Sequence, residues 1–179
     1  MPRPLTRDHR RIHARLHDHA LVVFEQTTSG RAALSCALER ARREGTELTV
    51  LHAMPYERVD TGCASCRHGA AIWNREMRYD AEEALAEARE LVGDDASVTH
   101  LIAKGQGAGE IARASREAHA DLIVLPSPRL TRLPRFACAS RVDGLRARGG
   151  WDVAVAPAAI GSEGGGAGLT AAEWRRLRR

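Results

Sequence analysis

The sequence has little aromatic character and almost no lysine. Aromatic residues make up 4% of the 179 residues, and Lys104 is the one lysine among 27 basic residues. Such a shift from lysine to arginine is expected of a GC-rich genome as much as of any function. An arginine at a given position therefore does not by itself identify a site for phosphate or nucleic acid.

The sequence also lacks a long apolar run. No stretch approaches the ~20 consecutive apolar residues that a transmembrane helix needs, and the arginine-rich N-terminus has no apolar core of the kind found in secretory signals. We therefore expect a cytoplasmic protein with no transmembrane segment. In that compartment the four cysteines are expected to be thiols or metal ligands rather than a disulfide framework.

The net charge of +4 is concentrated at the two ends of the chain. Residues 1–20 carry five Arg and two Asp, and residues 158–179 carry four Arg and two Glu. We predict a basic His/Arg-rich tail over residues 1–19, one domain over residues 20–157, and a Gly-rich linker with a short basic helix over residues 158–179. Within the domain, residues 129–148 are locally basic, with six Arg and one Asp.

Both tails allow a functional and a simpler interpretation. His9, His13 and His17 are spaced to share one helix face, which suits a metal-binding or acid-sensing surface; a basic leader with little burial is the simpler interpretation. The C-terminal segment suits an acidic partner, nucleic acid or an anionic surface. A solvated tail is the simpler interpretation there, since a helix of this length is marginal on its own.

Short apolar runs alternate with helical periodicity from residue 20 to residue 157. Strands are predicted at residues 21–24, 48–53, 97–103, 122–125 and 151–157. Between them we expect a helix that ends at Gly45, a helix over residues 70–92 in which Met77, Ala81, Ala84, Leu85, Ala88 and Leu91 face inward, a helix that carries Ile111 and Ala114, and a helix over residues 140–148. This alternation predicts a parallel α/β sandwich with right-handed crossovers.

The order of these elements, the strand Leu48-Thr-Val-Leu-His52 and the segment Ala120-Asp-Leu-Ile-Val-Leu125 resemble the universal stress protein family. The resemblance implies a Rossmann-like, adenine nucleotide alpha hydrolase-like fold, which is a three-layer α/β sandwich with a five-stranded parallel sheet of order 3-2-1-4-5. It also implies a homodimer formed through the last strand and a non-catalytic regulatory role. The sequence shows no Ser-His-Asp set or paired carboxylates, so we do not expect an enzyme. The protein partner that the module would regulate is not identified by the sequence.

The phosphate-binding motif of that family is altered in this sequence. The family signature after the fourth strand is Gly-x2-Gly-x9-Gly-Ser/Thr, which wraps the phosphates of ATP. Here Pro126, Arg129 and Ala139 stand at the glycine positions, and Ser140 matches. Proline removes an N–H donor, and the other two carry a steric cost where the backbone needs positive φ. ATP binding is therefore predicted to be weakened or lost.

The adenine end of the family's site is also altered. The family's first strand ends in Val-Asp-Gly-Ser, whose acid meets the adenine end of the nucleotide, and here Glu25, Gln26 and Thr27 occupy those places. A retained nucleotide site would use the residues that match this frame: Glu25, Thr27, His52, Ser127, Arg129, Arg132 and Ser140.

A first alternative keeps phosphate binding. Arg129, Arg132 and Arg135 lie in the altered loop, and their side chains would donate charge-assisted hydrogen bonds to phosphate in place of glycine N–H groups. In this alternative, ATP or another phosphate ligand binds through arginine side chains.

A second alternative uses the segment Cys63-x2-Cys66-x-His68, which we expect in a loop over residues 56–69. The spacing allows two thiolates and an imidazole to share zinc, with a fourth ligand from Cys138, His52 or a partner chain. The same spacing before a helix also favours redox exchange, because the helix lowers a thiol pKa. Incidental loop thiols are the simpler interpretation.

Overall fold

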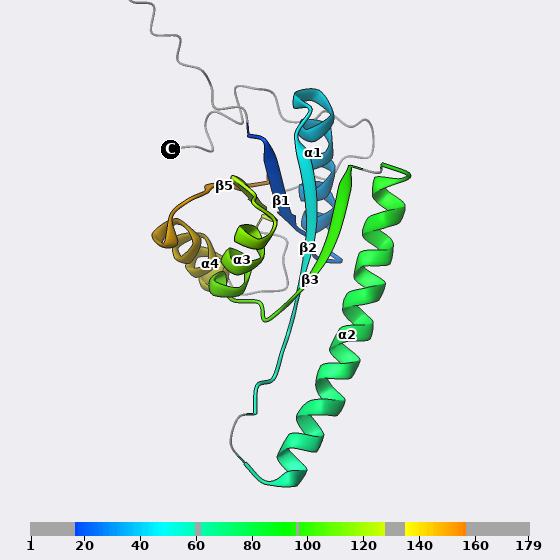
Figure 1. Ribbon diagram of the computed structural model, residues 1–179, viewed down its shortest axis with the longest axis vertical. Coiled ribbons are helices and arrows are strands. Elements are labelled where there is room, and N and C mark those ends of the chain that lie inside the picture. The colour runs from blue at the N-terminus through cyan, green and yellow to red at the C-terminus, as the bar shows by residue number, and fades with distance from the viewer. Residues whose placement is uncertain (1–16, 60–61, 96, 128–134, 157–179) are drawn as a thin grey trace, which may run out of the picture.

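The computed structural model describes residues 17–59, 62–95, 97–127 and 135–156, and for residues 135–140 it describes the backbone path only. Five parallel strands form one sheet in the order β3-β2-β1-β4-β5 (Figure 1). This order confirms the one expected from the sequence. The strands are β1 (His19–Val23), β2 (Glu47–Met54), β3 (Val98–Lys104), β4 (Leu122–Leu125) and β5 (Asp152–Val155).

Two helices cover each face of the sheet. They are α1 (Thr28–Glu44) and α2 (Ala64–Val92) on one face, and α3 (Ala108–Glu117) and α4 (Arg135–Arg148) on the other (Figure 1). Because successive strand residues point to opposite faces, Val22 of β1 packs with α1 and α2, while Leu21 and Val23 pack with α3 and α4. The predicted α/β sandwich is confirmed.

Helix α1 ends where its sequence predicts. The Thr27 hydroxyl accepts a hydrogen bond from the Gly30 N–H at the start, and Gly45 ends the helix in the left-handed conformation, with φ of 68°. The face packed on the sheet consists of Ala33, Leu34, Ala37, Leu38 and Ala41, all of them buried.

Helix α2 begins six residues earlier than predicted, at Ala64 rather than Ala70. The Cys63 side chain accepts a hydrogen bond from the Cys66 N–H and so takes the capping place that serine or aspartate usually fills. The expected inward position of Leu91 is also wrong, since that side chain is 48% exposed and Val92 is buried instead.

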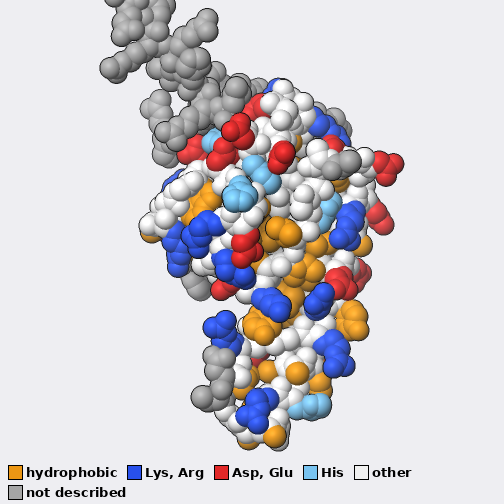
Figure 2. All heavy atoms as spheres, in the orientation of Figure 1, with side chains coloured by type: hydrophobic (Ala, Val, Ile, Leu, Met, Phe, Trp, Pro, Cys, Tyr) orange, Lys and Arg blue, Asp and Glu red, His pale blue; other side chains and the backbone are white. Residues whose placement is uncertain are grey.

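The first half of α2 projects beyond the carboxyl ends of the strands (Figure 1). Ile72, Trp73 and Tyr79 are exposed there, and Figure 2 shows apolar side chains interspersed with basic ones over this projecting part. The packed half begins at Ala81, where the helix reaches the sheet. The inward-facing apolar positions predicted for this helix are therefore buried only in the half that packs on the sheet.

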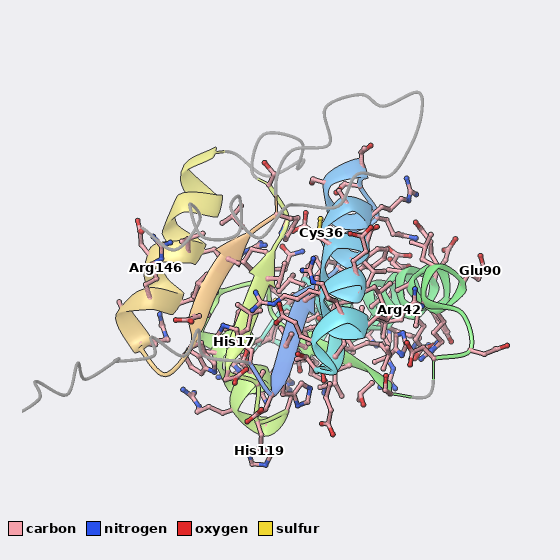
Figure 3. The ribbon with its side chains drawn as sticks, turned by 90° about the horizontal axis from the view of Figure 1, so that it is seen from above. His17, Cys36, Arg42, Glu90, His119 and Arg146 are labelled. Carbon is pink, nitrogen blue, oxygen red and sulfur yellow. The ribbon has the colours of Figure 1, made fainter. Side chains whose placement is uncertain are left out.

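His17 is part of the packed domain. It is only 5% exposed, and its Nδ1 lies 3.5 Å from Asp121 Oδ1 while its Nε2 lies 3.3 Å from Asp152 Oδ2. Figure 3 shows it among the strands at the end where the chain enters the sheet. The expectation of a leader with little burial is wrong at this position, because the carboxylates before β4 and in β5 enclose the ring. His9 and His13 lie outside the described residues.

In the part of the chain that the structure describes, no helix is both long and apolar enough to cross a membrane. The predicted C-terminal basic helix, with its linker, lies outside the described residues.

Candidate functional site

Three of the predicted site residues come together at the carboxyl edge of the sheet. Glu25 follows β1, His52 lies near the end of β2, and Ser127 follows β4. These strands are neighbours in the sheet, and the Phe24 N–H donates to the Leu51 carbonyl at 2.8 Å, which continues the pairing of β1 and β2 up to this edge. Ser127 is buried. In open parallel sheets this edge, where crossovers diverge to opposite faces, is the usual place for a ligand.

The Glu25 carboxylate is held by Arg141 from α4. Arg141 Nη1 donates to Glu25 Oε1 at 3.1 Å, and the two side chains are 9% and 21% exposed. The interaction connects the end of β1 to α4, which covers the face of the sheet opposite to α1. A charge-assisted hydrogen bond between two largely buried groups is among the stronger polar contacts in a protein.

Gly30 fixes the backbone beneath this ion pair. A Cβ at this position would overlap the Glu25 carbonyl oxygen, so only glycine lets the first turn of α1 approach the Glu25 backbone so closely. The turn from β1 into α1 therefore places the carboxylate of Glu25 by a backbone contact as well as by Arg141.

Thr27 caps helix α1. Its Oγ1 accepts from the Gly30 N–H at 3.0 Å and lies 3.2 Å from the Ser29 hydroxyl. The hydroxyl thereby satisfies one of the N–H groups that the start of a helix leaves without an intrahelical partner.

His52 is a half-buried residue with a backbone partner. Its Nδ1 donates to the Phe24 carbonyl, 3.1 Å away. Burial lowers the pKa of His52, an effect opposed by the hydrogen bond to Phe24 and by the negative charges of Glu25 and Asp80. The neutral ring is therefore the favoured form at this edge, and it presents no positive charge to a phosphate.

Ser140 does not begin a helix, contrary to the prediction. Helix α4 starts at Arg135, so Ser140 is its sixth residue. Only the first N–H groups of a helix lack an intrahelical acceptor, and the N–H of Ser140 lies past them. Without the expected glycine before Ser140, nothing in the local sequence stops the helix from extending back to Arg135. Arg129 and Arg132 lie outside the described residues.

The cysteine pair lies at the start of a helix and not in the expected loop. Cys63 and Cys66 belong to the start of α2, not to a loop, and His68 lies further along the same helix with its side chain exposed. Among the described residues, no group of three His, Cys, Asp or Glu side chains is arranged to hold a metal ion. The zinc hypothesis has no support in that part of the chain.

Two residues of this site were missed in the sequence. Arg141 lies within the basic segment noted above, but its pairing with Glu25 spans 116 positions, and composition does not reveal a partner so distant. Gly30 could have been noticed, because a glycine in the first turn of a helix indicates a close backbone approach.

Comparison with known proteins assigns the same fold and a family. The family model described as "Universal stress protein family" matches residues 17–157. Comparison with curated protein sequences gives no significant match.

Solved structures with this fold are similar to the chain at low sequence identity. The universal stress protein UspA from Lactobacillus plantarum has a TM-score of 0.62 and 19% identity, over 78% of this chain and 97% of that protein. A universal stress protein solved in complex with cAMP has a TM-score of 0.51 and 16% identity, over 78% and 97%. The Archaeoglobus fulgidus protein solved with dAMP has a TM-score of 0.50 and 18% identity, over 78% and 98%.

Proposed function

This chain belongs to the universal stress protein family, and we propose that it is a non-catalytic regulatory module whose nucleotide cleft has weakened or lost its affinity for ATP. The observation that carries the proposal is the ion pair between Glu25 and Arg141, which engages the carboxylate expected to meet adenine. A cytoplasmic location, expected from the sequence, is part of the proposal.

The ion pair opposes adenine binding energetically. For Glu25 to accept a hydrogen bond from an adenine amine, the contact with Arg141 must break or be shared, and Arg141 is only 9% exposed. A hydrogen bond to a charged group contributes about 1.5–3 kcal/mol, and more is lost when the charge left behind is buried. Since every 1.4 kcal/mol is about tenfold in affinity, this cost weakens binding by roughly 10- to 100-fold.

The phosphate end of the cleft supports the same proposal. Pro126, directly after β4, has no N–H to donate. Ser140 lies inside α4 rather than at its start, so its N–H is not among the free donors that attract anions at a helix N-terminus. Two backbone N–H groups that would bind the triphosphate in the family's motif are therefore not available to a phosphate here.

Adenine nucleotides are the appropriate test ligands. One similar structure holds cAMP and another, from Archaeoglobus fulgidus, holds dAMP. We expect titration calorimetry of the full chain with ATP, cAMP and dAMP to give no saturable heat up to millimolar nucleotide. The Archaeoglobus fulgidus protein, titrated with dAMP under the same conditions, is the positive control. Saturable micromolar binding of any of the three by this chain would overturn the proposal.

We further propose that the protein is a homodimer formed through β5. This strand is at the edge of the sheet and pairs with β4 alone among the described strands. The Asp152 and Ala156 N–H groups donate to carbonyls on the β4 side. Since amides alternate in direction along a strand, those of Val153 and Val155 point to the outer edge. A second β5 would satisfy them, as edge strands of other proteins do when they pair.

A further inference from the structure

The start of α2 brings two thiols into contact. Cys63 precedes the helix in an extended conformation, with φ of −67° and ψ of 164°, and Cys66 lies in the first turn. Their Sγ atoms are 2.8 Å apart. A disulfide of ordinary length, about 2.0 Å, therefore needs only a small movement of the two side chains. Both cysteines are exposed, whereas Cys36 is half-buried.

The surrounding turn favours the thiolate form of Cys63. Hydrogen bonding from the Cys66 thiol, and then from the Cys66 N–H at 3.3 Å, lowers the pKa of Cys63. The N-terminus of α2, a helix of 29 residues, adds partial positive charge at the same place. The thiolate is the nucleophile in disulfide chemistry, so Cys63 is the better attacking group of the pair.

The turn is held by contacts of its own. Gly62 has φ of 139°, a backbone conformation that favours glycine, and a side chain there would lie against the Cys66 Cβ and the Val59 side chain. Arg67 Nη1 donates to the Gly62 carbonyl at 3.0 Å. These contacts keep Cys63 at the helix start with Cys66 one turn away.

This turn lies at the far end of the projecting half of α2 (Figure 1). Both cysteines are exposed there, so a reagent or a partner reaches the thiols directly. The residues that frame the pair, Gly62 and Arg67, are also separate from those that hold Glu25. The thiols and the Glu25–Arg141 pair are therefore separate sites that share no contact residue.

We propose that Cys63 and Cys66 form a reversible dithiol–disulfide site that exchanges with disulfides of low-molecular-weight thiols. The Cys63 thiolate attacks one sulfur of the disulfide RSSR, which forms a Cys63–S–S–R bond and releases one thiolate RS⁻. The Cys66 thiolate, after losing its proton to solvent, attacks the Cys63 sulfur, which forms the Cys63–Cys66 bond and releases a second RS⁻. The protein gives up two electrons, RSSR accepts them, and protons from solvent convert the released thiolates to two RSH.

The test uses the full chain with Cys36→Ser and Cys138→Ser, so that only the pair can react. It is incubated with oxidised glutathione and its intact mass is measured before and after dithiothreitol. We expect a loss of two hydrogen atoms that dithiothreitol reverses. In the added Cys66→Ser variant we expect a persistent single glutathione adduct at Cys63, because no second thiol is left to displace it. A background protein that carries stable glutathione adducts and no internal disulfide would overturn the proposal.

A second measurement compares the two cysteines as nucleophiles. The rate of alkylation by iodoacetamide is followed against pH in the Cys66→Ser and Cys63→Ser variants of the same background, with circular dichroism to confirm that both are folded. We expect Cys63 to react several-fold faster at neutral pH, with a midpoint below the ~8.5 of an ordinary thiol. Equal rates and midpoints for the two cysteines would assign Cys63 a capping role alone and contradict the proposal.

Discussion

Arg141 Nη1 lies 3.1 Å from Glu25 Oε1, and this contact joins α4 to the end of β1 across the carboxyl edge of the sheet. The chain leaves β1 for α1 on one face of the sheet, whereas α4 covers the other face. The contact therefore lies where the crossovers diverge, which is where an α/β sheet usually receives a ligand. In this protein a side chain of the chain itself takes up the carboxylate there.

The first prediction concerns the close approach at Gly30. Gly30→Ala places a Cβ against the Glu25 carbonyl oxygen, so the backbone must shift, and we expect the free energy of unfolding to fall by at least about 2 kcal/mol. Gly69→Ala is the control, because it is also helical and has open space around it; it should leave stability unchanged or raise it by up to ~1 kcal/mol. Urea unfolding measures both, and equal effects would disprove the contact.

The second prediction concerns pH. Burial lowers the pKa of His52 in the folded state, so as pH falls the unfolded chain takes up this proton first. The contribution of His52 to stability is complete above the unfolded pKa of about 6.5 and decreases as pH falls below it. His52→Gln keeps an N–H for the Phe24 carbonyl and does not titrate.

Urea unfolding at pH 7.5 and at pH 5 therefore distinguishes the two proteins. We expect wild type to lose more stability than His52→Gln between these values. His100, whose pKa is also lowered by burial, still contributes to the decrease in both. The same loss in both proteins would show that the protonation of His52 is not coupled to folding.

The third prediction concerns His17. Its ring contacts Asp121 and Asp152, so His17→Ala leaves two neighbouring carboxylates without their shared partner. We expect a loss of about 1–3 kcal/mol in unfolding free energy. His68→Ala, which removes an exposed imidazole, should stay within about 0.5 kcal/mol of wild type. If both variants unfold at the wild-type urea concentration, the His17 contacts contribute nothing to stability.

The fourth prediction tests the proposed dimer. Val153→Pro removes an outward N–H of β5 and leaves the bonds to β4 made by Asp152 and Ala156 in place. We expect light scattering to show a dimer for wild type and a folded monomer for the variant. Ala154→Pro, whose amide faces β4, should instead destabilise the fold. A folded Val153→Pro dimer would place the interface elsewhere.

Much of the fold could be predicted from the sequence because the strands are short apolar runs with turn residues between them. Leu122–Leu125 is buried along its whole length, as a central strand of a parallel sheet must be. The strand order was implied by resemblance to the family, whose order of elements this chain follows. Gly45 ended α1 for a reason visible in the sequence, since its φ of 68° suits glycine.

The predicted first residues of α2 and α4 were wrong for local reasons. Cys63 caps α2 with a thiol, which is not a typical capping group. Helix α4 was expected to start at Ser140 because the family motif places its serine there, yet Arg135 begins the helix once the motif's glycines are replaced. Neither outcome can be read from propensity alone.

The contacts of the candidate site depend on tertiary structure. Glu25 was identified from its place after the first strand, but its partner Arg141 comes from the last helix. His17 was assigned to a polar tail because its neighbours are polar, and its burial depends on carboxylates from β5 and from the residue before β4. Sequence patterns report local periodicity and do not specify such pairings.

The measurement that tests the account most directly is the ATP affinity of Arg141→Ala compared with that of wild type. Removing the guanidinium frees Glu25 to meet adenine, and we expect saturable ATP binding to appear in Arg141→Ala at a concentration at least about tenfold below the millimolar range in which wild type shows none, a difference of about 1.4 kcal/mol or more. Circular dichroism confirms that the variant is folded, and Arg146→Ala, which removes an exposed arginine of the same helix, is the control. If Arg141→Ala binds ATP no more tightly than wild type, the claim that this ion pair weakens ATP binding is contradicted.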